Sequence, residues 1–185
     1  IAQKIINDLG ADLVDYAVVE FGGSAMSSIS VDQRHILCNT PIDIGAKSAL
    51  VEPDKVTLDY LANRVDGPLE LISSDLDANF REVVDYNLDN IEPQIATPPT
   101  PDCVVNISEV LGKKVHHAFI GSCAAPTLSD LEIAGKIIEG HKIHPDVRFI
   151  ITPGTQEVMG EAQKLGLLNL FSEAGAMITP PGCGP

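Results

Sequence analysis

The sequence has few aromatic and few basic side chains. Aromatic residues make up 4% of the 185 residues and Trp is absent, so Ile, Leu, Val and Ala must build the core. Twelve Lys and Arg residues stand against 26 Asp and Glu residues, and the formal net charge is −14. This balance argues against a nucleic-acid surface, which needs a basic stripe. An anionic ligand would have to be held by a metal or by cations from elsewhere.

Long apolar runs are also missing. No run is long enough to span a bilayer, and the first residues do not resemble a secretory signal peptide. The chain opens directly in a helical pattern over residues 1–10, which suggests a segment of a longer protein. We therefore predict a cytoplasmic protein that binds neither membranes nor nucleic acids.

Cysteine is sparse, and the chain contains no Cys-x-x-Cys pair. The wide spacing of the four cysteines disfavours disulfides and a self-contained zinc knuckle. We interpret Cys38, on a predicted helix, and Cys103, after a Pro-rich stretch, as structural. His116 and His117 would alternate along a predicted strand and point to opposite faces, so we do not expect them to share a metal.

Runs rich in β-branched residues alternate with helical patterns. This order predicts an α/β fold with mostly parallel sheets flanked by helices. Capping-box patterns predict helices that begin after Ser30 and Ser129, and a third helix is predicted to begin near Thr155. Pro41 should divide the first of these helices. Strands are predicted at residues 16–21, 48–51, 115–121, 147–152 and 176–179.

The composition divides the chain into three parts. Residues 1–64 and 103–185 have the alternating pattern and are predicted to form two α/β lobes. Residues 65–102 are acidic and end in a Pro-rich stretch, so we expect an extended segment that crosses between the lobes.

Three turns in the last third of the chain each follow a predicted strand. They are residues 121–123, 152–154 and 180–185, and two of them carry a cysteine, Cys123 and Cys183. Ligands of open α/β sheets gather at the carboxyl ends of strands. Thiolates beside glycine N–H donors are typical of iron–sulfur sites. Two other interpretations stay open: structural turns with space-filling cysteines, and an α/β enzyme that binds phosphate there.

A series of ordered motifs favours the iron–sulfur interpretation. The motifs are Glu20-Phe-Gly-Gly, Cys38-Asn39, Asp43-Ile-Gly-Ala-Lys47, Ile91-Glu-Pro-Gln-Ile95, Phe119-Ile-Gly-Ser-Cys123 and Gly182-Cys-Gly-Pro185. Their order and spacing resemble the aconitase superfamily over essentially the whole chain. Lys47 and Glu173-Ala-Gly-Ala176 resemble its 3-isopropylmalate dehydratase and homoaconitase branch, which implies leucine biosynthesis as one setting.

The resemblance implies specific roles. Cys123 and Cys183 match two of three thiolates that hold a [4Fe–4S] cluster, and the third is expected just beyond Pro185. Asn39 and Ser122 match residues beside the cluster. Asp43 matches an acidic residue, usually Glu in the family, that orients a catalytic histidine expected before residue 1.

The resemblance also implies a hydro-lyase. One iron would act as a Lewis acid on a small hydroxy-dicarboxylate, which is isomerised by dehydration and rehydration. A serine base and carboxylate-binding arginines would come from a swivelling domain or small subunit, so we expect this piece alone to be inactive.

One turn departs from the family pattern. Ala124 and Ala125 replace a Thr and an Asn that normally follow the first ligand. Asp43 is also one methylene shorter than the usual Glu. An alternative is therefore a diverged, non-catalytic scaffold or binding protein.

Overall fold

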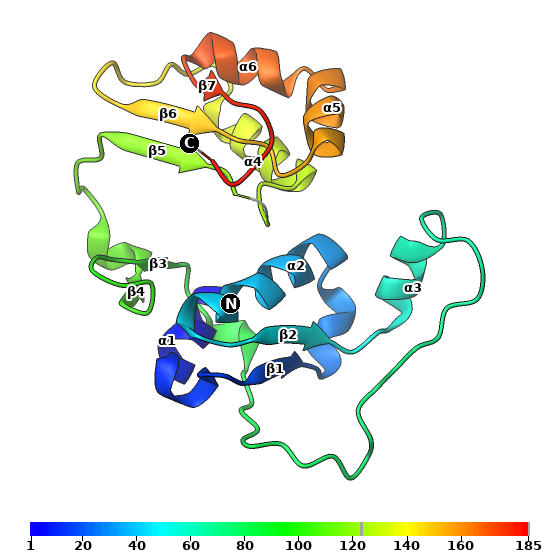
Figure 1. Ribbon diagram of the computed structural model, residues 1–185. Helices are drawn as coiled ribbons and strands as arrows, with labels where there is room; N and C mark the ends of the chain where they lie inside the picture. Colours follow the sequence, from blue (N-terminus) through cyan, green and yellow to red (C-terminus); the bar gives the residue numbers. More distant parts are fainter. Residues whose placement is uncertain (123, 185) are drawn as a thin grey trace. The chain divides into compact units, whose positions relative to one another are not determined.

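In the computed structural model, which describes residues 1–122 and 124–184 (for 11 and 12 the backbone only), the chain divides into two units. The first unit is Ile1–Leu111 and the second is Gly112–Pro185 (Figure 1). Residues 103–111, assigned from the sequence to the second lobe, group with the first unit. The reason is that β4 (Val104–Asn106) pairs antiparallel with β3 (Gln94–Ala96). This hairpin was not predicted.

The first unit is built around a parallel strand pair. Strand β1 (Val18–Phe21) pairs with β2 (Ser48–Val51). Two clusters of buried apolar side chains pack the first helix of this unit. One contains Ile6 and contacts Val19 of β1. The other contains Ile5 and Leu37 and joins the first helix to the second. The helical elements are α1 (Ala2–Val14), η1 (Ser24–Ser28), α2 (Val31–Asn39), η2 (Thr40–Ile44), α3 (Lys55–Leu61), η3 (Leu88–Asn90) and η4 (Ile107–Val110).

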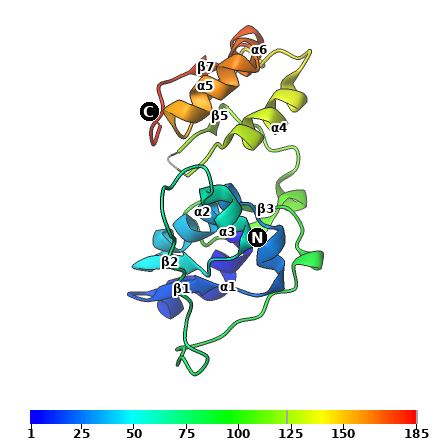
Figure 2. The same ribbon diagram turned by 90° about the vertical axis from the view of Figure 1, so that its right-hand side faces the viewer.

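The acidic segment between α3 and η3 is an open, largely exposed excursion (Figure 2). Two of its side chains hydrogen-bond to the N-terminal part of the first unit. The Ser74 hydroxyl donates to Glu20 Oε2 at 2.7 Å, and Arg81 Nη1 donates to the Leu13 carbonyl at 3.0 Å. Burial of its side chains therefore contributes little to the stability of the unit.

The second unit is a parallel three-stranded sheet in the order β5-β6-β7. Its strands are β5 (His117–Ile120), β6 (Arg148–Ile151) and β7 (Met177–Ile178), and its helices are α4 (Leu128–Ile138), α5 (Gln156–Lys164) and α6 (Leu167–Ala174). The three helices contact one another, and Leu131, Ala162 and Phe171 from them pack with Phe149 and Ile151 of β6. The mixed α/β architecture with mostly parallel pairing confirms the predicted fold class.

Local signals predicted two of the three helix starts that rested on a cap residue correctly. Ser30 caps α2 in a capping box with Gln33, and Thr155 caps α5. Pro41 lies in the first turn of η2, where α2 has ended, as predicted. The predicted start at Ser129 is wrong. Thr127 is the N-cap of α4, because its hydroxyl accepts from the Asp130 N–H while Asp130 accepts from the Thr127 N–H at 2.8 Å.

Candidate functional site

The three turns predicted from the sequence follow the carboxyl edge of the β5-β6-β7 sheet. The Thr152 N–H donates to the Ile120 carbonyl at 2.8 Å, and the Thr179 N–H donates to the Ile151 carbonyl at 3.0 Å. These bonds extend the ladder one step past the strands on both sides of β6. The turn after β5 and the turn after β7 thus leave the same edge of one parallel sheet, where α/β proteins place their ligands.

Two hydroxyls, one buried and one half-buried, join the strand ends. Thr152 is 1% exposed, and its Oγ1 lies 2.5 Å from Thr179 Oγ1. The Gly154 N–H donates to the Pro126 carbonyl at 3.3 Å, which ties the turn after β6 to the chain beyond the first cysteine turn. The sequence analysis did not predict this threonine pair. The signal that could have indicated it is that a Thr ends each of two predicted strands, at residues 152 and 179.

The ring of Phe119 lies between the two cysteine-bearing turns. A Cβ added to Gly121 would overlap this ring, and a Cβ added to Gly184 would lie 2.6 Å from Phe119 Cζ. Since an ideal Cβ is about 1.5 Å from its Cα, the Cα atoms of Gly121 and Gly184 are at most about 8 Å apart. The turns before Cys123 and around Cys183 therefore converge.

The predicted cluster ligands are placed only in part. Cys123 lies outside the described residues. Its neighbour Ser122 is half-buried with φ of 128°, a left-handed backbone that non-glycine residues rarely adopt. Cys183 is exposed and precedes Gly184, whose φ is 109°. Within residues 1–122 and 124–184, no group of three or more His, Cys, Asp or Glu side chains is placed to hold a metal.

At this edge the described residues supply one donor that a [4Fe–4S] cluster could use, the thiol of Cys183. Cysteine thiolates are the ligands that such clusters use. Gly121 and Gly184 bring the backbones of the two cysteine turns close to each other. Cys183 is exposed, so its thiol is accessible to an incoming metal group.

The other two predicted site residues belong to the first unit. Asn39 is the last residue of α2, and Asp43 lies in η2. Both are exposed. Pro41, buried between them, and Gly45, with φ of 100°, fix the turn on which they stand. Their polar groups are thus presented to solvent on one short segment of the first unit.

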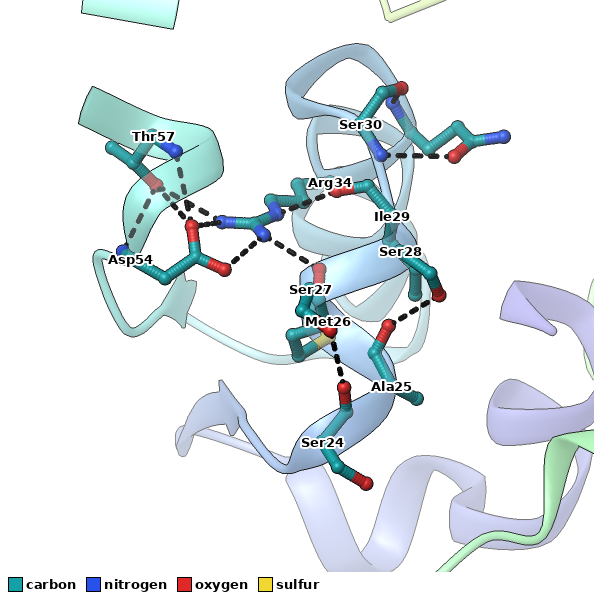
Figure 3. Close-up of polar contacts among 11 residues, drawn as sticks. Ser24, Ala25, Met26, Ser27, Ser28, Ile29, Ser30, Arg34, Asp54 and Thr57 are labelled. Atoms are coloured by element: carbon teal, nitrogen blue, oxygen red, sulfur yellow. Dashed lines mark hydrogen bonds and ion pairs between the residues drawn. The ribbon is translucent and has the colours of Figure 1, made fainter. Parts of the chain in front are cut away.

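Arg34 of α2 is a buried structural residue (Figure 3). It is 4% exposed. Its guanidinium donates to both carboxylate oxygens of Asp54 at 2.8 and 2.6 Å, and to the carbonyls of Ile29 and Met26 at 3.0 and 2.7 Å. It also donates to the Thr57 hydroxyl at 3.0 Å. This arginine therefore joins η1, α2 and α3 and is committed to that role.

Asp54 completes the same network. Its carboxylate accepts from the Thr57 N–H at 3.0 Å and so caps α3. The Arg34 hydrogen bonds, which outweigh the effect of desolvation, hold the pKa of Asp54 well below its usual range. The side chain of Asp54 is 31% exposed, so water screens part of this interaction.

The remaining thiols and imidazoles show no sign of a site. Cys38 is half-buried on α2, and burial raises the pKa of its thiol, which agrees with its predicted structural role. Cys103 is exposed, and its sulfur lies 3.2 Å from the Thr100 hydroxyl. His116 and His117 are exposed at the start of β5. No helix in the described ranges is long and apolar enough to cross a membrane.

Comparison with known proteins decides the family. A model described as the aconitase family (aconitate hydratase) matches residues 1–116 and 108–185. The chain belongs to the aconitase family. It is 38% identical over its whole length to "3-isopropylmalate dehydratase large subunit 1" of Methanopyrus kandleri. It is 41% identical over 97% of its length to the protein of the same name from Pyrococcus furiosus.

A third relative of this aconitase-family chain carries a different name. The "Probable methanogen homoaconitase large subunit" of Methanothermobacter thermautotrophicus is 37% identical over 98% of the chain. The chain spans 44%, 43% and 42% of the lengths of these three relatives. It thus covers less than half of each relative, and it is similar to large subunits of both names.

Proposed function

We propose that this aconitase-family chain is the cluster-carrying part of a [4Fe–4S] hydro-lyase, which isomerises a small hydroxy-dicarboxylate by dehydration and rehydration. The observation that carries the proposal is the approach of the turns that bear Cys123 and Cys183, with the Phe119 ring between Gly121 and Gly184. The ordered motifs and the names of the relatives support the same chemistry. A cytoplasmic location stays a prediction.

Cys123 and Cys183 would hold the cluster, together with a third cysteine expected beyond Pro185. When bound, the cluster supplies a Lewis-acidic iron that can polarise a hydroxyl and a carboxylate. Residues of the β5-β6-β7 sheet hold the two cysteine turns in place. The contact between the buried Thr152 and the half-buried Thr179 holds the ends of β6 and β7 together. Ile150, at the centre of the sheet, is itself buried at 4% exposure.

The charges for binding a carboxylate substrate would come from a partner. The chain has 12 basic and 26 acidic residues, and Arg34 is occupied by Asp54. An anion near this chain therefore needs cations from outside it. The relatives are named large subunits, which supports a small-subunit partner that supplies arginines and a serine base. Asn39 and Asp43 would act beside the cluster and on a catalytic histidine.

A second function is favoured by one specific observation. Ala124 and Ala125 are half-buried in the turn where the family has Thr and Asn, so hydrogen-bonding groups beside Cys123 are missing. A diverged scaffold that holds a cluster without turnover would tolerate this loss. Restoring both side chains with Ala124→Thr and Ala125→Asn would then leave turnover at zero.

The test is anaerobic reconstitution of the complete natural polypeptide that contains residues 1–185. Iron and sulfide are added, with the small subunit present, and isopropylmalate, homocitrate and citrate are assayed in turn. Broad cluster absorbance with turnover of one substrate supports the hydro-lyase. A cluster without turnover, unchanged by the restoring substitutions, favours the scaffold. A protein that takes up no iron contradicts both functions.

A further inference from the structure

Phe119 occupies an unusual place for a large apolar side chain. Its neighbours Ala118 and Ile120 pack against the core formed by α4, α5 and α6. Side chains alternate along a strand, so Phe119 projects from the opposite face of the sheet. It is 44% exposed there. Burial in the core therefore does not account for a phenylalanine at this position.

The ring takes the place that a side chain at Gly121 would need. Residues 119 and 121 share one face of the strand, and a Cβ on Gly121 would overlap the ring tip and both of its flanking carbons. Gly121 does not have the left-handed backbone that often requires glycine. The three nearest atoms that a Cβ at this position would meet all belong to the Phe119 ring, so the ring accounts for the requirement for glycine.

The same ring tip meets the second cysteine turn. A Cβ on Gly184 would lie 2.6 Å from Phe119 Cζ and 3.2 Å from Cε1. The segment after β7 reaches β5 by passing across β6, as the red trace in Figure 1 shows. Gly184 immediately follows Cys183, so the ring lies against the backbone next to this cysteine. In the sequence, Phe119 precedes Gly121, where the Cys123 turn begins, by two residues.

We propose that Phe119 is a positioning residue that sets the spacing between the Cys123 turn and the Cys183 turn. The proposal rests on the proposed cluster site, which it deepens. The ring acts as a spacer between two glycine backbones. It holds the turns at the separation that one cofactor can bridge, and it does so before any metal arrives. Outer-shell groups that orient metal ligands typically cost about 10- to 100-fold in metal affinity when they are mutated, and we expect the loss of the Phe119 ring to fall at the lower end of that range.

The first experiment measures the spacing without metal. The complete natural polypeptide carries Cys38→Ala and Cys103→Ala, and every cysteine outside residues 1–185, including the one expected just beyond Pro185, is replaced by Ser. Cys123 and Cys183 are then the two thiols under test. A fluorogenic reagent that emits only after linking two nearby thiols reports their proximity. We expect linking in the Phe119 protein and a loss of most of the signal in Phe119→Ala. Phe119→Leu, which keeps an apolar side chain, should fall between them.

The second experiment is a double-mutant comparison of cluster retention. After anaerobic loading, Phe119→Ala and Gly121→Ala should each lose iron to a chelator about tenfold faster than the unsubstituted protein. The double variant should be no worse than Phe119→Ala, because removing the ring frees the space for the new Cβ. Phe80→Ala, at a phenylalanine that is 52% exposed in the first unit, is the matched control and should retain iron normally.

The outcomes separate the two proposals. Normal thiol linking in Phe119→Ala, or losses that simply add in the double variant, would overturn the spacer role while leaving the cluster in place. An unsubstituted protein that links its thiols but takes up no iron would overturn the proposed function and leave the spacing argument standing. A loss of iron in Phe119→Ala without a change in thiol linking also contradicts the spacer.

Discussion

Replacement of Arg34 by Met should destabilise the first unit strongly. Arg34 is 4% exposed and donates five hydrogen bonds, three to Asp54 and Thr57 and two to backbone carbonyls. Loss of a buried ion-pair partner typically costs about 3–5 kcal/mol. Because the Asp54 side chain is 31% exposed, water can take over part of the role of Arg34. We therefore expect the free energy of unfolding to fall by about 3 kcal/mol.

The assay is urea denaturation, followed by amide exchange on α2 and α3 to locate the loss. Arg64→Met is the matched control, because Arg64 is exposed and its guanidinium lies 4.3 Å from the centre of the Tyr60 ring. That variant should lose no more than about 1 kcal/mol. Equal losses in the two variants, or a loss at Arg34 below about 1 kcal/mol, would refute the assignment of Arg34 as the tie between η1, α2 and α3.

Three further predictions follow from the same contacts. The pKa of Asp54 is lowered in the folded state from its ordinary value of 3.8, so its contribution to stability is complete above that value and is lost as pH falls through the folded pKa. The difference in unfolding free energy between the natural protein and Asp54→Asn should therefore be constant from about pH 7 to about pH 5 and shrink below about pH 4. Urea denaturation at each pH measures this difference. Thr152→Val removes the contact with the half-buried Thr179 hydroxyl, which keeps the Pro180 carbonyl at 3.5 Å, and should cost about 1 kcal/mol, whereas adding Thr179→Val should recover part of that loss in a double-mutant cycle. Because burial raises the pKa of Cys38, alkylation at pH 8 should be slower at Cys38 than at Cys103, and mass-spectrometric rates that are equal would contradict the half-buried placement.

Local sequence signals predicted much of the second unit. β-branched runs marked β5 and β6, and glycines at the strand ends marked the turns, because both depend on backbone preferences of neighbouring residues. The start of α4 was misplaced by choosing Ser129 over Thr127, since two hydroxyl residues stand close together and only the geometry selects one. The short helix α3 was not predicted, although Asp54 caps it.

The contacts that assemble the candidate site could not be predicted from the sequence. Phe119 meets Gly184 across 65 residues of chain, and Thr152 meets Thr179 across two strands. Such contacts depend on strand order, which no local pattern specifies. The sequence likewise did not show that Arg34 is buried and hydrogen-bonded to Asp54, because Arg34 belongs to α2 and Asp54 caps α3.

Iron retention in two matched cysteine variants tests the central claim most directly. Cys183 and Cys103 are both exposed thiols, but only Cys183 stands on a turn that meets the end of β5. After anaerobic reconstitution of the complete natural polypeptide, iron per chain is counted for Cys183→Ser and Cys103→Ser. We predict that Cys183→Ser loses the cluster and that Cys103→Ser keeps the iron content of the unsubstituted protein. Equal iron in both variants would contradict a cluster held at this edge of the sheet.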